Sequence, residues 1–233
     1  MLPMAGDENV GVYAPPVVRP ADFPRISKAL LRDIMDLPGA ATTTSDVLDE
    51  YGMSLAVPAD VLRPRAVRKV VAGQALTISY LPERRALSHS GLRQSPSHLA
   101  HHTLFTMTSP GDVVVVDARG SDGISVLGGM AAASASNLGI SACVVDGGVR
   151  DLDEIDKTGL SVWSRSLTPR TGKWRLEAFG LNLPVSCGGV QVIPGDVVVA
   201  DHTGVCFVPV DLADQVLTRV LEISAQEAAD RVR

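Results

Sequence analysis

A valine-rich segment that occurs twice constrains the fold more than any other feature of the sequence. Residues 110–117 read PGDVVVVD, and residues 194–201 read PGDVVVAD. A Pro-Gly-Asp turn followed by three or four valines predicts a short strand that is buried on both of its faces. Such strands lie in sheets that are covered by other layers on both sides. Two unrelated turn-and-strand units in a β-rich chain would give the same pattern, so the repetition alone does not imply a duplication.

Helical patterns surround these strands. Apolar residues recur at helical spacing in residues 25–37, and Gly39 is expected to end that helix. Thr44 or Ser45 is expected to cap a second helix, and Asp211 a final helix of about five turns. Between them, strands and helices alternate: strand 70–81 with Gly73 as a bulge or turn, helix 99–107, strand 110–120, helix 128–139, strand 140–148, helix 149–159 and strand 160–167. This alternation predicts an α/β fold built as a layered sandwich.

Length and composition indicate one cytoplasmic domain. The 233 residues suit a single domain, and we expect an irregular arm over residues 1–24 before an α/β domain over residues 25–233. A net charge of −5 and an aromatic content of 4% argue against nucleic-acid binding. No stretch approaches the roughly 20 apolar residues of a membrane span, and the first 20 residues lack the pattern of a signal peptide. Cys143, Cys187 and Cys206 have no metal-binding spacing, so we expect buried, reduced thiols.

The stretch between the two valine-rich segments holds the best candidates for anion binding. Gly128 and Gly129 open a helix of small residues, and its first amides, around Met130 and Ala131, could bind a carboxylate or phosphate. Arg150 follows the next strand beside a pair of glycines that permit close approach of a ligand. Its planar guanidinium suits bidentate recognition of a carboxylate.

The acidic residue after this arginine suggests a metal. Asp151 could hold Mg²⁺, which commonly binds one or two carboxylates and completes its coordination shell with water. The alternative is that Arg150 and Asp151 cap the following helix and form a structural ion pair. The residues alone leave both interpretations open.

These stretches resemble the RraA-like family, which includes the class II 4-hydroxy-4-methyl-2-oxoglutarate aldolases and the regulators of ribonuclease activity. The matching segments are PGDVVVVDARG, LGGMAAASASNLGISACVVDGGVRDLDEI and PGDVVVADHTGVCFVP, and the resemblance covers about residues 70–230. It implies an αββα sandwich of the swivelling-domain type. It also implies assembly as homotrimers or homohexamers, with sites at the subunit interfaces.

The resemblance assigns roles to residues. In the family's aldolases an acidic residue is followed, after twenty residues, by Arg-Asp and, after two more, by a second acid. This pattern places Arg-Asp at Arg150 and Asp151 and the second acid at Glu154. It implies that Arg150 grips the carboxylate of a pyruvate-type substrate and steadies its enolate. It further implies that Asp151 and Glu154 hold Mg²⁺ or Mn²⁺, and that the backbone at residues 128–131 binds the oxo-acid.

One position departs from the aldolase pattern. The first acid, which serves as the acid/base, corresponds to Gly129, and glycine cannot transfer a proton. Loss of a general base costs about 10²–10⁴-fold in rate, whereas decarboxylation of a β-keto acid such as oxaloacetate demands less of a base. Replacing Gly129 by Asp is therefore expected to raise an aldolase rate.

Histidines offer a substitute base. His89, His98, His101 and His102 precede the first valine-rich strand, and histidine titrates near neutral pH. We hypothesise that His101 or His102, or else His98, lines the pocket and takes the missing role. The alternative is a solvated loop and a helix surface, because adjacent residues on a helix point in different directions.

The sequence therefore predicts a cytoplasmic, oligomeric, divalent-metal-dependent lyase. It would cleave or decarboxylate a small oxo-acid through an enolate that the metal and Arg150 stabilise. Two alternatives remain. One is a non-catalytic, protein-binding regulator of the RraA type. The other is an enzyme of the same fold with a different substrate, in which Gly129 enlarges the pocket.

Overall fold

A computed structural model describes residues 15–83 and 97–231 of the chain. Its helices are α1 (Lys28–Met35), α2 (Ala40–Glu50), α3 (His101–Phe105), α4 (Gly129–Asn137), α5 (Leu152–Thr158) and α6 (Ala213–Arg231). Its strands are β1 (Val17–Val18), β2 (Ala56–Pro58), β3 (Arg63–Ala66), β4 (Val71–Pro82), β5 (Val113–Leu127), β6 (Ala142–Val149), β7 (Ser161–Leu167), β8 (Leu176–Leu181), β9 (Val185–Cys187), β10 (Val190–Val192), β11 (Val197–Ala200) and β12 (Gly204–Val208). The predicted α/β class is confirmed.

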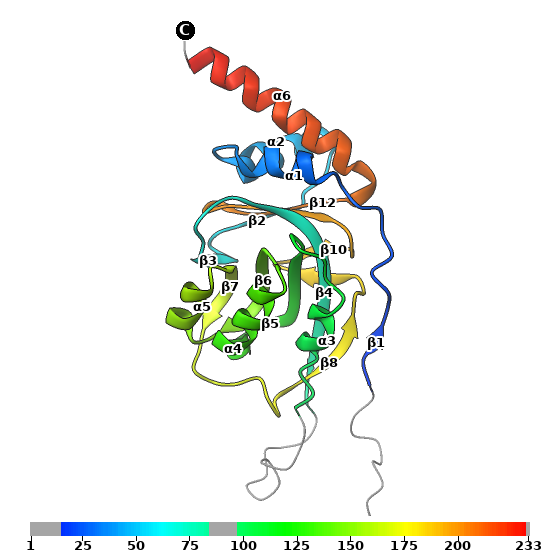
Figure 1. Cartoon of the computed structure of the whole chain (residues 1–233), viewed down its shortest axis with the longest axis vertical. Coiled ribbons are helices and arrows are strands. Elements are labelled where there is room, and N and C mark those ends of the chain that lie inside the picture. Colours follow the sequence, from blue (N-terminus) through cyan, green and yellow to red (C-terminus); the bar gives the residue numbers. More distant parts are fainter. Residues whose placement is uncertain (1–14, 84–96, 232–233) are drawn as a thin grey trace, which may run out of the picture.

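The strands form two stacked sheet regions that share β4. The strand order is β2-β12-β11-β4-β5-β6-β7-β3, with β8 also paired to β4 and β1 to β8. The first half of β4 pairs antiparallel with β11, and its middle pairs parallel with β5. Helices α1, α2 and α6 cover the β11–β12 region, and α3, α4 and α5 cover the parallel β5–β6–β7 region (Figure 1). The layers are therefore α, β, β and α, as expected.

Three apolar cores separate the four layers, and the valine-rich strands contribute to all of them. On β5, Val114 and Val116 face the core under α3, α4 and α5, while Val113 and Val115 face the core between the sheets. On β11, Val197 and Val199 pack under α1, α2 and α6, while Val198 faces the core between the sheets. Both valine runs are therefore buried on two faces, as predicted.

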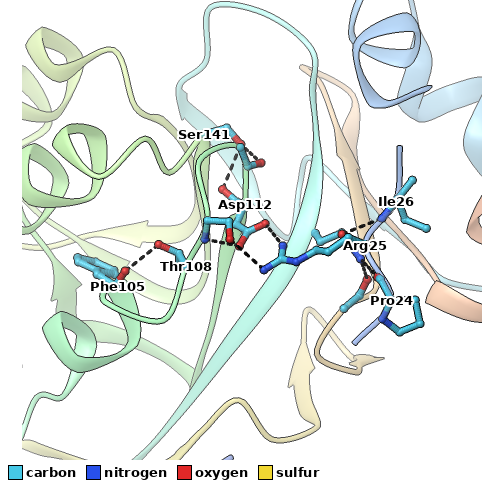
Figure 2. A network of polar contacts seen from close by, with 11 residues as sticks. Pro24, Arg25, Ile26, Phe105, Thr108, Asp112 and Ser141 are labelled. Carbon is cyan, nitrogen blue, oxygen red and sulfur yellow. Dashed lines mark hydrogen bonds and ion pairs between the residues drawn. The ribbon is translucent and has the colours of Figure 1, made fainter. Parts of the chain in front are cut away.

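The two Pro-Gly-Asp turns have the same geometry. Asp112 accepts a hydrogen bond from the Ser109 amide at 2.7 Å, and Asp196 accepts one from the Ile193 amide at 2.8 Å. Their second oxygens have different partners. The guanidinium of Arg25 reaches Asp112 at 2.6 Å from the segment before α1 (Figure 2), whereas the amide of Val210 donates to Asp196.

Three local predictions at the ends of elements were wrong. Helix α1 ends at Met35 with Asp36 as its C-cap, so Gly39 does not end it. Helix α2 begins at Ala40, with Gly39 in the left-handed conformation as its N-cap, and not at Thr44 or Ser45. The reason is a distant partner, since the Ala41 amide donates to a carboxylate oxygen of Asp201 at 3.1 Å. Asp211 lies in a 3₁₀ turn (Val210–Leu212), and α6 begins at Ala213.

Gly73 makes neither a bulge nor a turn. It lies inside the continuous strand β4. A Cβ there would collide with the carbonyl oxygen of Gly111 and lie 3.1 Å from a methyl group of Val113. Glycine is therefore needed for close approach of the turn that precedes β5.

The segment before α1 lies against the domain where the structure describes it. The amide of Arg19 donates to the Leu181 carbonyl at 3.1 Å, and the Asn182 amide group donates to the Pro20 carbonyl at 2.6 Å. The three cysteines are buried free thiols, as predicted. No helix within residues 15–83 and 97–231 is long and apolar enough to cross a bilayer.

Candidate active site

The candidate site lies where two parallel strands end side by side. Leu127, at the end of β5, pairs with Val149, at the end of β6. Helix α4 begins two residues after Leu127, and the amide of Arg150 donates to the Leu127 carbonyl at 3.0 Å. The glycine pair and Arg150 are therefore adjacent, although twenty residues separate them in the chain. Ligands of open parallel sheets bind at this end of the strands.

Asp151 is held in an unusual backbone conformation. Its φ of 56° and ψ of 44° lie in the left-handed region, which is strained for residues other than glycine and least so for Asn and Asp. The Asp151 carboxylate does not cap its own helix α5. One oxygen instead lies 3.3 Å from the Gly129 amide and 3.3 Å from Nε of Arg150. Asp151 therefore occupies the N-cap position of α5 without a side-chain capping bond, and the ion pair of that alternative is present.

The glycine pair makes room for the acidic side chains. An ideal Cβ on Gly128 would lie 2.8 Å from Oδ2 of Asp151 and 3.0 Å from Nε of Arg150. An ideal Cβ on Gly129 would lie 2.7 Å from Cβ of Glu154 and closer still to its Oε2. Distances below about 3.0 Å are not seen for real Cβ atoms, so a side chain at either position would displace a site residue. The structure therefore places both carboxylates directly over the glycines.

The start of α4 offers donors for an anion. The first amides of a helix have no partner within it, and here the Gly129 amide already points at Asp151. Those of Met130 and Ala131 follow in the first turn, where the helix dipole favours negative charge. Met130 is 87% exposed, whereas its neighbours Gly129 and Ala131 are buried. Arg150 and Asp151 are also accessible, with side chains 38% and 40% exposed.

The sequence matches the model of one protein family. Residues 41–207 match the family model described as RraA-like, Aldolase/RraA. The chain belongs to the RraA-like family. The resemblance inferred from three sequence segments is thereby confirmed, and so is the fold that it implies.

Several similar proteins carry an aldolase name. A Halalkalibacterium halodurans protein, provisionally named a 4-hydroxy-4-methyl-2-oxoglutarate aldolase, is 35% identical over 121 residues, which are 52% of this chain and 57% of the relative. A Pseudomonas syringae protein with the same provisional name is 29% identical over 166 residues, 71% of this chain and 93% of the relative. The chain thus spans little more than half the length of the first of them.

One similar solved structure is described as an RraA protein. Streptomyces coelicolor RraAS2, described as an unusual member of the RNase ES inhibitor RraA protein family, has a TM-score of 0.75 at 27% identity. The match covers 91% of this chain and 100% of that one.

Two carboxylates at this RraA-like site have the chemistry of metal ligands. No group of three or more His, Cys, Asp or Glu side chains suited to a metal occurs in the part of the chain that the structure describes. Asp151 and Glu154 converge over the glycine pair, and both are exposed to solvent. A pair of carboxylates fits Mg²⁺ or Mn²⁺, because these ions retain several waters in protein sites.

The histidines form a cluster of their own on α3. The rings of His101 and His102 are 4.4 Å apart, and each lies within 6 Å of the Phe105 ring. Burial, together with the smaller effects of the charges of His102 and Lys173, lowers the pKa of His101 to about 4. A neutral His101 can accept a proton but is a weak base at this pKa. Nδ1 of His98 lies 3.2 Å from Glu83, and His89 lies outside the described residues. The assignment of a histidine as the base stays a prediction.

Sequence reasoning missed the placement of Glu154. The pattern of the family pointed to this residue as a metal ligand, but it did not reveal that its side chain fills the space beside Gly129. The available signal was the helical position of Glu154, which lies in the first turn of α5 and therefore near Asp151. Whether the Glu154 side chain points toward α4 depends on the backbone turn at Asp151. The sequence does not specify that turn.

Proposed function

We propose that this RraA-like protein is a divalent-metal-dependent carbon–carbon lyase that acts on a small oxo-acid. The observation that carries the proposal is the convergence of Arg150, Asp151 and Glu154 over the glycine pair at the start of α4. The provisional aldolase names of two relatives support the same reaction class.

The residues assigned to the metal are Asp151 and Glu154. Asp151 is the first ligand in this proposal, since its strained backbone holds the carboxylate at the mouth of the site. Glu154 would bind through a water, which leaves its carboxylate free to accept a proton. When bound, Mg²⁺ or Mn²⁺ supplies Lewis acidity toward the oxygen atoms of the oxo-acid.

Arg150 is assigned to the substrate. With its Nε near Asp151, the outer edge of its guanidinium is placed to hold the carboxylate next to the keto group. The amides of Met130 and Ala131 would share that charge. In decarboxylation, the C3–C4 bond of oxaloacetate breaks, CO₂ leaves, and the electron pair forms an enolate at C2 and C3. Arg150 stabilises the enolate until a proton from solvent at C3 gives pyruvate.

Aldol cleavage needs one further group. A base must remove the proton of the C4 hydroxyl before the C3–C4 bond breaks, and Gly129 has no side chain to do so. The volume beside Gly129 is occupied by Glu154 instead. We therefore propose that Glu154 presents the carboxylate that the aldolase pattern places on α4, so that aldol cleavage survives at a reduced rate.

Assembly and location complete the proposal. We propose a cytoplasmic homotrimer or homohexamer with sites between subunits, which the family resemblance implies. The exposed side chains of Met130 and Leu167 flank the site and supply apolar surface for such a contact. Free buried thiols accord with a reducing compartment.

A second candidate function is the protein-binding regulator of the RraA type. The full-length match to RraAS2 favours it. Pyruvate release from oxaloacetate and from 4-hydroxy-4-methyl-2-oxoglutarate, with Mg²⁺ or with a chelator, separates the two. The lyase requires metal-dependent turnover of at least one substrate, and the regulator requires none.

Metal binding is tested without turnover by titrating Mn²⁺ and following its electron paramagnetic resonance signal. Asp151→Asn is expected to weaken binding by at least tenfold, and Glu154→Gln by less. Asp153→Asn is the matched control, because Asp153 is an exposed acid next to Glu154 in the same helix. Equal affinity in all four proteins would contradict the assigned ligands.

A further inference from the structure

A cavity lies away from the candidate active site. It has a volume of about 340 Å³ and lies between α1, β4 and the turn that precedes β5. That turn precedes the start of β5, whereas the glycine pair follows the end of β5. The two sites therefore lie at opposite ends of this strand. The volume falls within the roughly 300–1,000 Å³ of small-molecule pockets.

The walls of this cavity are aliphatic. Leu31 and Met35 lie one turn apart on α1, and both are partly buried against the core beneath that helix. Ile26, Ala72 and Pro110 complete the apolar lining. A fully polar ligand would lose water at these walls without gaining hydrogen bonds, which disfavours a compact dianion such as an oxo-acid.

The mouth of the cavity is basic. Lys28 and Arg32 are also one turn apart on α1, and their row runs beside the row of Leu31 and Met35. Both basic side chains are exposed, and neither forms an ion pair with any residue in the described ranges. The helix therefore presents a row of positive charge along a row of apolar surface.

The acidic residue at this mouth is already neutralised. Asp112 is the one acid among the described residues that line the cavity. Arg25 donates to Asp112 at 2.6 Å and to the hydroxyl of Ser109 at 3.2 Å, so it bridges the N-terminal segment and the turn (Figure 2). The charges of Lys28 and Arg32 remain without a counterion from the lining.

We propose that this cavity binds a small amphiphilic carboxylate, with an aliphatic chain against Leu31 and Met35 and its anionic head between Lys28 and Arg32. Charge complementarity selects the carboxylate, and the aliphatic walls select the chain. Binding in this cavity does not depend on the proposed lyase reaction. Each buried methylene strengthens binding by up to about fourfold, so affinity rises with chain length until the cavity is filled.

The test uses octanoate and methyl-¹³C-methionine NMR on the full chain. The protein has six methionines, of which Met35 lines the cavity and Met130 lies at the candidate active site. Octanoate is expected to shift the Met35 signal saturably, with one site per chain and with Met130 unmoved. Butanoate should bind at least tenfold more weakly, and uncharged octanamide at least fivefold more weakly.

Substitutions identify the basic head site. The double variant K28Q/R32Q is expected to weaken octanoate binding at least fivefold, whereas Lys69→Gln, which removes an exposed charge outside the cavity, should not. Equal affinity for octanoate and octanamide, or an unmoved Met35 signal, would overturn the proposal. A change of oligomeric mass in K28Q/R32Q without octanoate binding would also overturn it, because the face would then contact a second copy of the chain.

Discussion

The side chain of Glu154 occupies the space that a side chain on Gly129 would need. An ideal Cβ at Gly129 would lie 2.7 Å from Cβ and 3.1 Å from Cδ of Glu154. Because Cβ of Glu154 is fixed to α5, rotation of its side chain cannot relieve the first contact. Gly129, which departs from the aldolase pattern, and Glu154, which completes it, therefore compete for the same space.

This coupling is measurable as stability. Gly129→Ala is expected to lower the free energy of unfolding by about 1–3 kcal/mol, because it overpacks the contact between α4 and α5. Glu154→Gly alone should cost about 1 kcal/mol for glycine in a helix. In the double variant the two losses should not add, with a coupling energy of about 0.5–3 kcal/mol. Urea denaturation of the four proteins gives these values, and strict additivity would show that the side chains do not compete.

The same contact changes what is expected of an acid at position 129. Gly129→Asp alone must displace Glu154 and shift α5, so we now expect little gain in aldolase rate from it. The exchange G129D/E154G moves the carboxylate from α5 to α4. At saturating Mg²⁺, which offsets the loss of Glu154 as an assigned metal ligand, it should give the higher aldolase rate of the two. Pyruvate release from 4-hydroxy-4-methyl-2-oxoglutarate measures both. A larger gain from the single variant would contradict the volume argument.

Asp151 should be replaceable without loss of stability. Its left-handed backbone strains any residue with a Cβ, and glycine removes that strain. Asp151→Gly is therefore expected to match or exceed the wild-type free energy of unfolding, and to exceed Asp151→Ala by about 1 kcal/mol. Thermal unfolding compares the three proteins. If Asp151→Gly is the least stable of them, the strain at this residue does not matter to folding.

Asp196 gives folding a pH dependence. Burial raises the pKa of its carboxyl, the amides of Ile193 and Val210 offset part of this, and the charge of Asp211 adds to it, so that the pKa rises from 3.8 to about 6. Because the folded state binds the proton more tightly, this contribution is complete below about pH 4 and is lost as the pH rises through 6. The loss is at most about 3 kcal/mol.

Urea denaturation at pH 4, 5, 6 and 7 tests this sign. The free energy of unfolding of Asp196→Asn should fall less between pH 4 and 7 than that of the wild type. The variant also loses one accepted amide hydrogen bond, which lowers its stability at every pH and leaves the slope unaffected. Parallel pH profiles for the two proteins would exclude Asp196 as the source.

The parts of the fold that were predictable depend on local pattern. Alternating burial of Val113 to Val116 between two cores follows from a run of valines, and α4 follows from its glycine opening. The start of α2 was not predictable, since its amide partner Asp201 lies 160 residues away.

Strand β5 shows a similar limit. It runs to Leu127 rather than to residue 120, through a polar stretch that looks like a loop. That stretch stays in the sheet through irregular pairing with β6, in which Ser121 pairs with Gly147 and Ser125 with Gly148. The sequence pattern predicted Arg150, Asp151 and Glu154 as site residues. Where their side chains meet depends on the turn between β6 and α5.

The most direct test of the account is the effect of Arg150→Ala on pyruvate release from oxaloacetate at saturating Mg²⁺. Arg150 is half-exposed, so its loss should leave the fold and Mn²⁺ binding intact. We predict metal-dependent turnover in the wild type and a fall of about 10²–10³-fold in kcat in the variant. This is the loss expected when a hydrogen-bond donor to a developing oxyanion is removed. Equal rates in the two proteins, or no metal-dependent rate in either, would contradict it.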